Sequence, residues 1–172
     1  MYENLKSVTV AAGTIGIVML LQKGVGVRGI AGMSIREFLL AGTGFLPEYI
    51  ESRIRTVFLN NCPADNIDIV KVKDGDILSL SGALPGVAGM AMGRDTPISP
   101  FRSEISAKNT EDVGEGEILL KVKLFNLIAK EVGASLLEQG VIVDANLVLQ
   151  TFGENAPDGI TADTGNVLLI VN

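Results

Sequence analysis

The stretch from Ile69 to Gly82, IVKVKDGDILSLSG, constrains the fold more than any other part of this 172-residue chain. Two runs of alternating apolar and polar residues flank an Asp74-Gly75-Asp76 corner, and this pattern predicts two strands joined by a tight reversal. Glycine accepts the positive φ that such a turn requires, and the aspartates on either side hydrogen-bond nearby backbone N–H groups. The corner therefore predicts part of a sheet, with a structural role.

The chain before this corner reads as further strands and two helices. Residues 7–22 are rich in Val, Ile and Thr and suit one or two strands, and the alternating valines of KGVGVRG (23–29) predict a hairpin partner for the first strand. Ser34, followed three residues later by Glu37, forms a capping box at the start of a helix. A second short helix is expected in FLPEYIESRI (45–54).

The composition changes at 83–117, which is rich in glycine and proline and ends in an acidic stretch. We interpret it as a connection. Beyond it, the pattern predicts a strand at ILLKVKLF, a helix that ends near Gly140, a short strand, a short helix and a terminal strand. The sequence thus predicts an α+β protein with a mixed sheet: an N-terminal unit (1–86), a Gly/Pro-rich connection (87–116) and a smaller αβ unit (117–172), which can pack as one body.

Three motifs of the first unit carry a family resemblance: the helix SIREFLL (34–40), the Asn-ended strand VFLNN (57–61) and the corner VKDGDI (72–77). Residues 25–86 resemble the ubiquitin-like β-grasp fold, and more narrowly the small sulfur carriers that include the small subunit of molybdopterin synthase. That family uses a free C-terminal Gly-Gly carboxylate, whereas this chain continues past Gly86 with VAGMAMGRD. The resemblance therefore implies a β-grasp-like architecture, without carrier chemistry.

Composition excludes several function classes. The net charge of −6 argues against nucleic acid as a partner, because phosphate backbones need a basic footprint. The chain contains no histidine, which removes imidazole acid–base catalysis and histidine metal ligands, and its one cysteine excludes an internal disulfide. We predict no cofactor, no metal site and no catalytic residue set.

The most unusual stretch is GVAGMAMGRD (86–95). Its glycines allow the backbone to approach a ligand closely, and an arginine pairs with a carboxylate or phosphate. The predicted site consists of Gly86, Gly89, Gly93, Arg94 and Asp95, and its ligand would be a small anion. The spacing is not that of a P-loop. The alternative is a connection whose methionines fill a neighbouring groove or an oligomer contact.

Cys62 lies before a proline in a predicted turn, where a reactive thiol and an incidental cysteine are both open interpretations. The acidic residues near the Asp-Gly-Asp corner lack the spacing of a calcium loop, so they read as solvated turns.

The apolar stretch VTVAAGTIGIVMLL (8–21) resembles part of a signal peptide, but it is too short to span a membrane and lacks a preceding basic region. We expect a buried strand there, a cytoplasmic protein and no membrane partner.

Two function classes remain open. The first is a non-enzymatic binding or scaffold module that self-associates, because 47% of the residues are hydrophobic and only 20% are charged. The second is an accessory factor or enzyme in sulfur- or molybdopterin-type cofactor metabolism, which would use the glycine-rich loop at 86–95. The first is favoured, since the supply of catalytic side chains is small.

Overall fold

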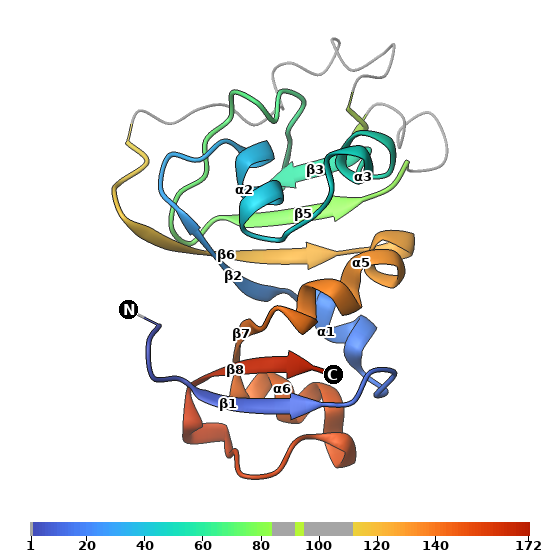
Figure 1. Cartoon of the computed structure of the whole chain (residues 1–172), viewed down its shortest axis with the longest axis vertical. Helices are drawn as coiled ribbons and strands as arrows, with labels where there is room; N and C mark the ends of the chain where they lie inside the picture. The colour runs from blue at the N-terminus through green and yellow to red at the C-terminus, as the bar shows by residue number, and fades with distance from the viewer. Residues whose placement is uncertain (1, 84–91, 95–111) are drawn as a thin grey trace.

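The strands form a single mixed sheet of eight, in the order β1-β8-β7-β2-β6-β5-β3-β4 (Figure 1). The computed structural model describes residues 2–83, 92–94 and 112–172. Strands β1 and β8 are parallel, as are β5 and β6, and the other neighbours are antiparallel. The strand bounds are β1 Lys6–Val10, β2 Val25–Ile30, β3 Thr56–Leu59, β4 Cys62–Pro63, β5 Ile77–Ser81, β6 Glu117–Leu124, β7 Val141–Asp144 and β8 Asn166–Val171.

Five helices accompany the sheet within the described ranges, and the predicted α+β class is confirmed. Two begin at polar caps: the Ser34 hydroxyl accepts a hydrogen bond from the Glu37 N–H while the Glu37 carboxylate accepts one from the Ser34 N–H, and Asp144 caps α6. The helix bounds are α1 Ile17–Lys23, α2 Ile35–Ala41, α3 Pro47–Ser52, α5 Asn126–Glu138 and α6 Ala145–Phe152, with 3₁₀ turns η2 Gly153–Asn155 and η3 Ala162–Thr164.

Strands from the two predicted units alternate in this sheet. Strand β6, from the segment 117–172, lies between β2 and β5 of the segment 1–86, and β7 and β8 lie between β1 and β2 (Figure 1). Every strand neighbour of β2 therefore comes from the second segment, and one sheet runs through both.

The prediction for residues 7–22 is wrong in its second half. Strand β1 forms at Lys6–Val10, but Ile17–Lys23 is helix α1, with Leu20 and Leu21 fully buried. The expected hairpin does not form either, because β2 pairs with β6 and β7 whereas β1 pairs with β8. A short apolar run fits a buried helix as well as a buried strand, so its pattern could not distinguish them. The expected strand before the Asp-Gly-Asp corner is reduced to one isolated bridge, at Lys71.

The Asp-Gly-Asp corner is confirmed. Gly75 has a φ of 82°. The carboxylate of Asp76 accepts the N–H of Lys73 at 2.9 Å, and that of Asp74 accepts the N–H of Leu119 at 2.8 Å. The second bond reaches β6, so the corner joins both segments of the chain.

The two faces of the sheet differ. On β6 the buried residues Ile118, Leu120, Val122 and Leu124 alternate with more exposed ones. The buried side is the covered face, on which Phe38 of α2 packs against β2: a Cβ added to Gly29 would lie 2.8 Å from its ring. We call the opposite side, which carries Arg28 and Lys121, the second face.

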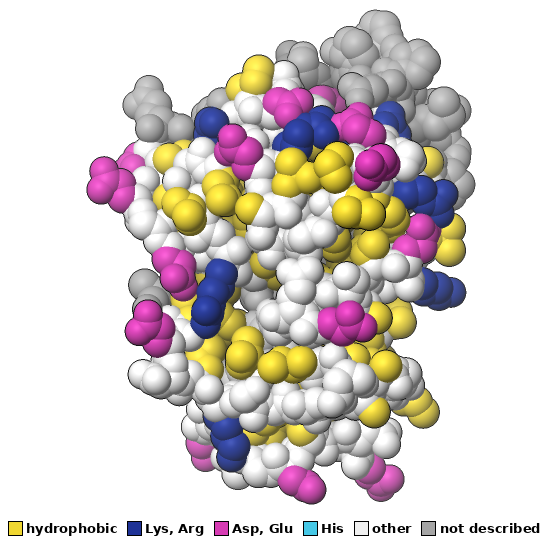
Figure 2. Space-filling view, in the orientation of Figure 1, with side chains coloured by type: hydrophobic (Ala, Val, Ile, Leu, Met, Phe, Trp, Pro, Cys, Tyr) yellow, Lys and Arg dark blue, Asp and Glu magenta, His cyan; other side chains and the backbone are white. Residues whose placement is uncertain are grey.

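The molecular surface seen in Figure 2 carries acidic and basic side chains of both signs, with apolar side chains between them. No helix within the described ranges is long and apolar enough to cross a membrane.

Candidate functional site

The structure describes only part of the site predicted in the glycine-rich stretch. Gly93 and Arg94 are described and buried, whereas Gly86, Gly89 and Asp95 lie outside the described residues. Cys62 is an exposed free cysteine, but it lies in strand β4 and not in the predicted turn.

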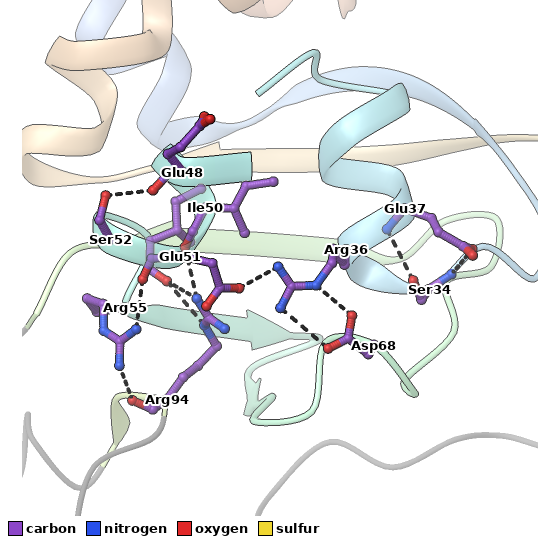
Figure 3. A network of polar contacts seen from close by, with 11 residues as sticks. Ser34, Arg36, Glu37, Glu48, Ile50, Glu51, Ser52, Arg55, Asp68 and Arg94 are labelled. Atoms are coloured by element: carbon purple, nitrogen blue, oxygen red, sulfur yellow. Dashed lines mark hydrogen bonds and ion pairs between the residues drawn. The ribbon is translucent and has the colours of Figure 1, made fainter. Parts of the chain in front are cut away.

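Arg94 is buried at the C-terminal end of helix α3, with 1% of its surface exposed. Its Nη2 donates to the carbonyl oxygens of Ile50 at 3.0 Å and Ile54 at 2.6 Å, and its Nε donates to Ile54 at 3.1 Å (Figure 3). Carbonyls at a helix C-terminus lack intrahelical donors and carry partial negative charge, which a guanidinium satisfies. The structure thus places this guanidinium against the end of α3.

Arg55 holds the backbone of Arg94 from the other side. The Arg94 N–H donates to the Arg55 carbonyl at 2.6 Å, and Arg55 Nη2 donates to the Arg94 carbonyl at 2.9 Å. Arg55 Nη1 also donates to the carbonyl of Glu51 at 2.9 Å. Figure 3 shows the Arg55 side chain reaching the carbonyl oxygen of Arg94, whereas the Arg94 guanidinium lies against the end of α3. Both acceptors are neutral carbonyls, and Arg55 forms no ion pair within the described part of the chain.

A cavity of about 280 Å³ lies beside Arg55. It is found at the C-terminal ends of the parallel strands β5 and β6, and Ala83, which lines it, lies three residues before the predicted glycine-rich stretch 86–95. The carboxyl ends of parallel strands are where open sheets commonly bind ligands. The lining residues are Ser52, Arg53, Arg55, Ser81, Gly82, Ala83, Asn126, Leu127, Ile128 and Glu131.

The first turn of α5 opens into this cavity. No side chain caps the helix, and its first turn carries no acidic residue. Asn126 has a φ of 55° and donates from its amide to the Ser81 hydroxyl at 3.1 Å, so its side chain points back to β5. The lining residues Leu127 and Ile128 belong to the turn whose N–H groups form the positive end of the helix dipole.

The second arginine of the lining is neutralised. Arg53 forms a two-pronged ion pair with Glu131 of α5, with Nε 3.1 Å from one carboxylate oxygen. This pair raises the pKa of Arg53 and lowers the pKa of Glu131, so both groups stay charged and paired. Arg55 is therefore the cation of this cavity that has no carboxylate partner among the described residues.

Tyr49 provides a pH-dependent prediction near this pair. Its burial, and secondly the negative charge of Glu131, raise the pKa of Tyr49 to about 12, against an ordinary value of about 10. The folded chain therefore holds the phenolic proton more tightly than the unfolded chain. This contribution to stability is fully present below about pH 10 and is lost as the pH rises toward 12.

The measurement is a phenolate absorbance titration of the parent and of Tyr49→Phe, which leaves one of the two tyrosines. We expect Glu131→Gln to lower the pKa of Tyr49 while burial, the larger cause, keeps it above the ordinary value. Ionisation of Tyr49 at its ordinary pKa would contradict the burial argument.

Sequence reasoning named the glycine-rich stretch, of which the structure describes Gly93 and Arg94, and did not name Arg53, Arg55 or the first turn of α5. A signal was present in RIRTVF, where two arginines alternate directly before a strand and share one side of it. No local pattern in the sequence indicated that the first turn of α5 would line this cavity, because the order of the strands in the sheet is what places the helix there.

Comparison with protein-family models, with curated proteins and with solved structures finds no match to this chain.

Proposed function

We propose that this protein is a non-enzymatic binding module whose ligand is a small anion held in the arginine-lined cavity. The observation that carries the proposal is Arg55, a cation without a carboxylate partner in the described structure, lining the same cavity as the uncapped start of α5. A guanidinium and free helix N–H groups are both donors, and together they favour a carboxylate, phosphate or sulfate group.

The size of the cavity supports a compact ligand. Its volume of about 280 Å³ lies just below the range of about 300–1,000 Å³ typical of pockets for drug-sized molecules. The hydroxyl of Ser81 and the backbone of Gly82 add hydrogen-bonding groups around the opening. Inorganic phosphate, or the anionic end of a larger molecule, fits this description.

The side chains of the lining favour binding over catalysis. Glu131 is its acidic member, and Arg53 holds that carboxylate in an ion pair, which makes it a poor proton acceptor. The chain also contains no histidine to act as general base.

The test is a calorimetric titration of the full chain and of Arg55→Met with sodium phosphate at low ionic strength. We expect the parent to bind and the variant to bind about tenfold more weakly, since a charge-assisted hydrogen bond contributes on the order of 1.5 kcal/mol. Lys130→Met is the matched control, because it removes one exposed positive charge from α5 outside the cavity lining. Its affinity should stay within about twofold of the parent, as expected for a screened surface charge.

Arg55→Lys separates binding from folding, because it keeps the charge but loses the planar fork that holds Arg94. If Arg55→Lys binds phosphate at least as tightly as Lys130→Met does, and Arg55→Met binds it more weakly, the positive charge at position 55 accounts for the affinity. Equal affinities of the parent and Arg55→Met would overturn the proposal.

Self-association, predicted from the apolar composition, belongs to the same proposal. Ile15 is 80% exposed and Met19 is 51% exposed, and both lie beside the outermost strand β1 and the start of α1, where a partner would cover them. The β-grasp resemblance, the role in sulfur or molybdopterin metabolism and the cytoplasmic location remain predictions.

A further inference from the structure

The connection between α6 and β8 contains an Asp-Gly pair, a sequence with its own chemical reactivity. The chain has two such pairs, Asp74-Gly75 and Asp158-Gly159, and no Asn-Gly pair. The backbone nitrogen of the glycine can attack the aspartate side chain, because glycine carries no Cβ to hinder the approach. The structure places the two pairs in opposite surroundings, and this difference predicts which of them reacts.

The pair at the Asp-Gly-Asp corner is held by strand β6. The Gly75 N–H donates to the carbonyl oxygen of Leu119 at 3.0 Å, and Oδ1 of Asp74 accepts the Leu119 N–H at 2.8 Å. Both groups that would have to react are therefore hydrogen-bonded to one residue of an interior strand. A reaction here requires both bonds to break first, and two bonds of typical net strength reduce the reactive population roughly thirtyfold.

The pair at 158–159 has none of these restraints. Both residues are exposed, in a turn where Gly159 has a φ of 82°. Among the described residues, the Gly159 N–H donates no hydrogen bond, and the Asp158 carboxylate accepts none and forms no ion pair. The nitrogen and the carboxyl group are therefore available to each other and to water.

Lys6 places a positive charge beside this glycine. Its ammonium group donates to the Gly159 carbonyl oxygen, and a Cβ added to Gly159 would lie 3.1 Å from Nζ. The glycine nitrogen must lose its proton in order to attack, and a nearby cation stabilises the anion that results. The contact engages the carbonyl group of Gly159 and leaves its N–H free.

We infer that Asp158 is a site of spontaneous isomerisation to isoaspartate through a succinimide. The nitrogen of Gly159 forms a bond to Cγ of Asp158, and the hydroxyl of the protonated carboxyl group leaves with the amide proton as water. A second water molecule opens the ring, at Cγ to restore aspartate or at the main-chain carbonyl carbon to give isoaspartate. The isoaspartate product lengthens the main chain just before Ile160, which is buried.

The experiment is an incubation of the folded full chain at neutral pH in water enriched in ¹⁸O, followed by digestion in ordinary water and peptide mass spectrometry. Each ring opening leaves a heavy oxygen on the aspartate that reacted, whether aspartate or isoaspartate results. We expect the label to accumulate at Asp158 at least about tenfold faster than at Asp74, because two hydrogen bonds protect the corner. In urea, where neither pair is folded, the two rates should become similar.

Two variants of the exposed position 158 serve as controls. Asp158→Asn should react faster, because a neutral amide accepts the nucleophile more readily than an ionised carboxylate does. Asp158→Glu should react far more slowly, because its longer side chain requires a larger ring.

Equal labelling of Asp158 and Asp74 in the folded chain would overturn the inference. So would an unlabelled Asp158 over the period in which the unfolded chain reacts. The site shares no residue with the arginine-lined cavity. Asp158→Glu should therefore bind phosphate as the parent does, and neither result decides the other.

Discussion

Replacing Arg94 with methionine is expected to lower the free energy of unfolding by about 3 kcal/mol, the size of two charged hydrogen bonds lost at a buried site. Arg94 is 1% exposed, and its guanidinium donates to the carbonyls of Ile50 and Ile54 at the end of α3. Without it these acceptors lose their donors, and the backbone bonds between Arg94 and Arg55 lose their anchor.

Urea denaturation followed by circular dichroism measures this loss. Arg94→Lys should lose about half as much, because an ammonium keeps the charge but cannot bridge two carbonyls in one plane. Arg53→Met is the matched control. Arg53 is an exposed arginine in the same region, and its replacement should lower the free energy of unfolding far less than that of Arg94. A variant Arg94→Met within about 0.5 kcal/mol of the parent would fall in the range of ordinary surface substitutions and would contradict the buried anchor.

Truncating Phe38 to alanine should cost about 4 kcal/mol, the usual range for removing a buried phenylalanine from a core. The side chain is fully buried between α2 and the covered face of the sheet. Its ring lies so close to β2 that a Cβ added to Gly29 would be 2.8 Å away, and one added to Gly42 would be 2.9 Å away. Glycines at both positions fix the ring, so little can move in to fill the space.

The comparison within the same helix is Leu40, which is 37% exposed. Leu40→Ala should cost about 1 kcal/mol, because part of that side chain already contacts water. If Phe38→Ala destabilises the protein no more than Leu40→Ala in urea denaturation, the packing of α2 on β2 is not the main attachment of this helix.

Local signals in the sequence predicted local structure well. The capping box at Ser34 and the positive φ of Gly75 both follow from short-range chemistry, and both are confirmed. Residues 17–22 were predicted as strand because the stretch 7–22 is rich in Val, Ile and Thr. They form a helix because Leu20 and Leu21 are buried, and Leu21 lies close to Gly133 of α5, a contact that no local pattern records.

The order of the strands could not be predicted in the same way. Strand β6 lies between β2 and β5, although 35 residues separate Ser81, the last residue of β5, from Glu117, the first residue of β6. The pairing of strands so far apart in the sequence depends on how all the strands assemble, which no local sequence pattern records. The cavity shares this property, because α3, β5 and α5 each contribute to it from different parts of the chain. Sequence reasoning therefore named Arg94, the arginine in the glycine-rich stretch, whereas the structure places Arg55 at the cavity.

The most direct test of the central claim is a ¹H–¹⁵N NMR titration of the full chain with sodium phosphate, which shows where the anion binds. The proposal predicts that the largest saturable shifts occur at the backbone amides of Leu127, Ile128 and Gly82, around the arginine-lined cavity. Shifts that are largest elsewhere, or that grow linearly without saturation, would contradict an anion site at the start of α5.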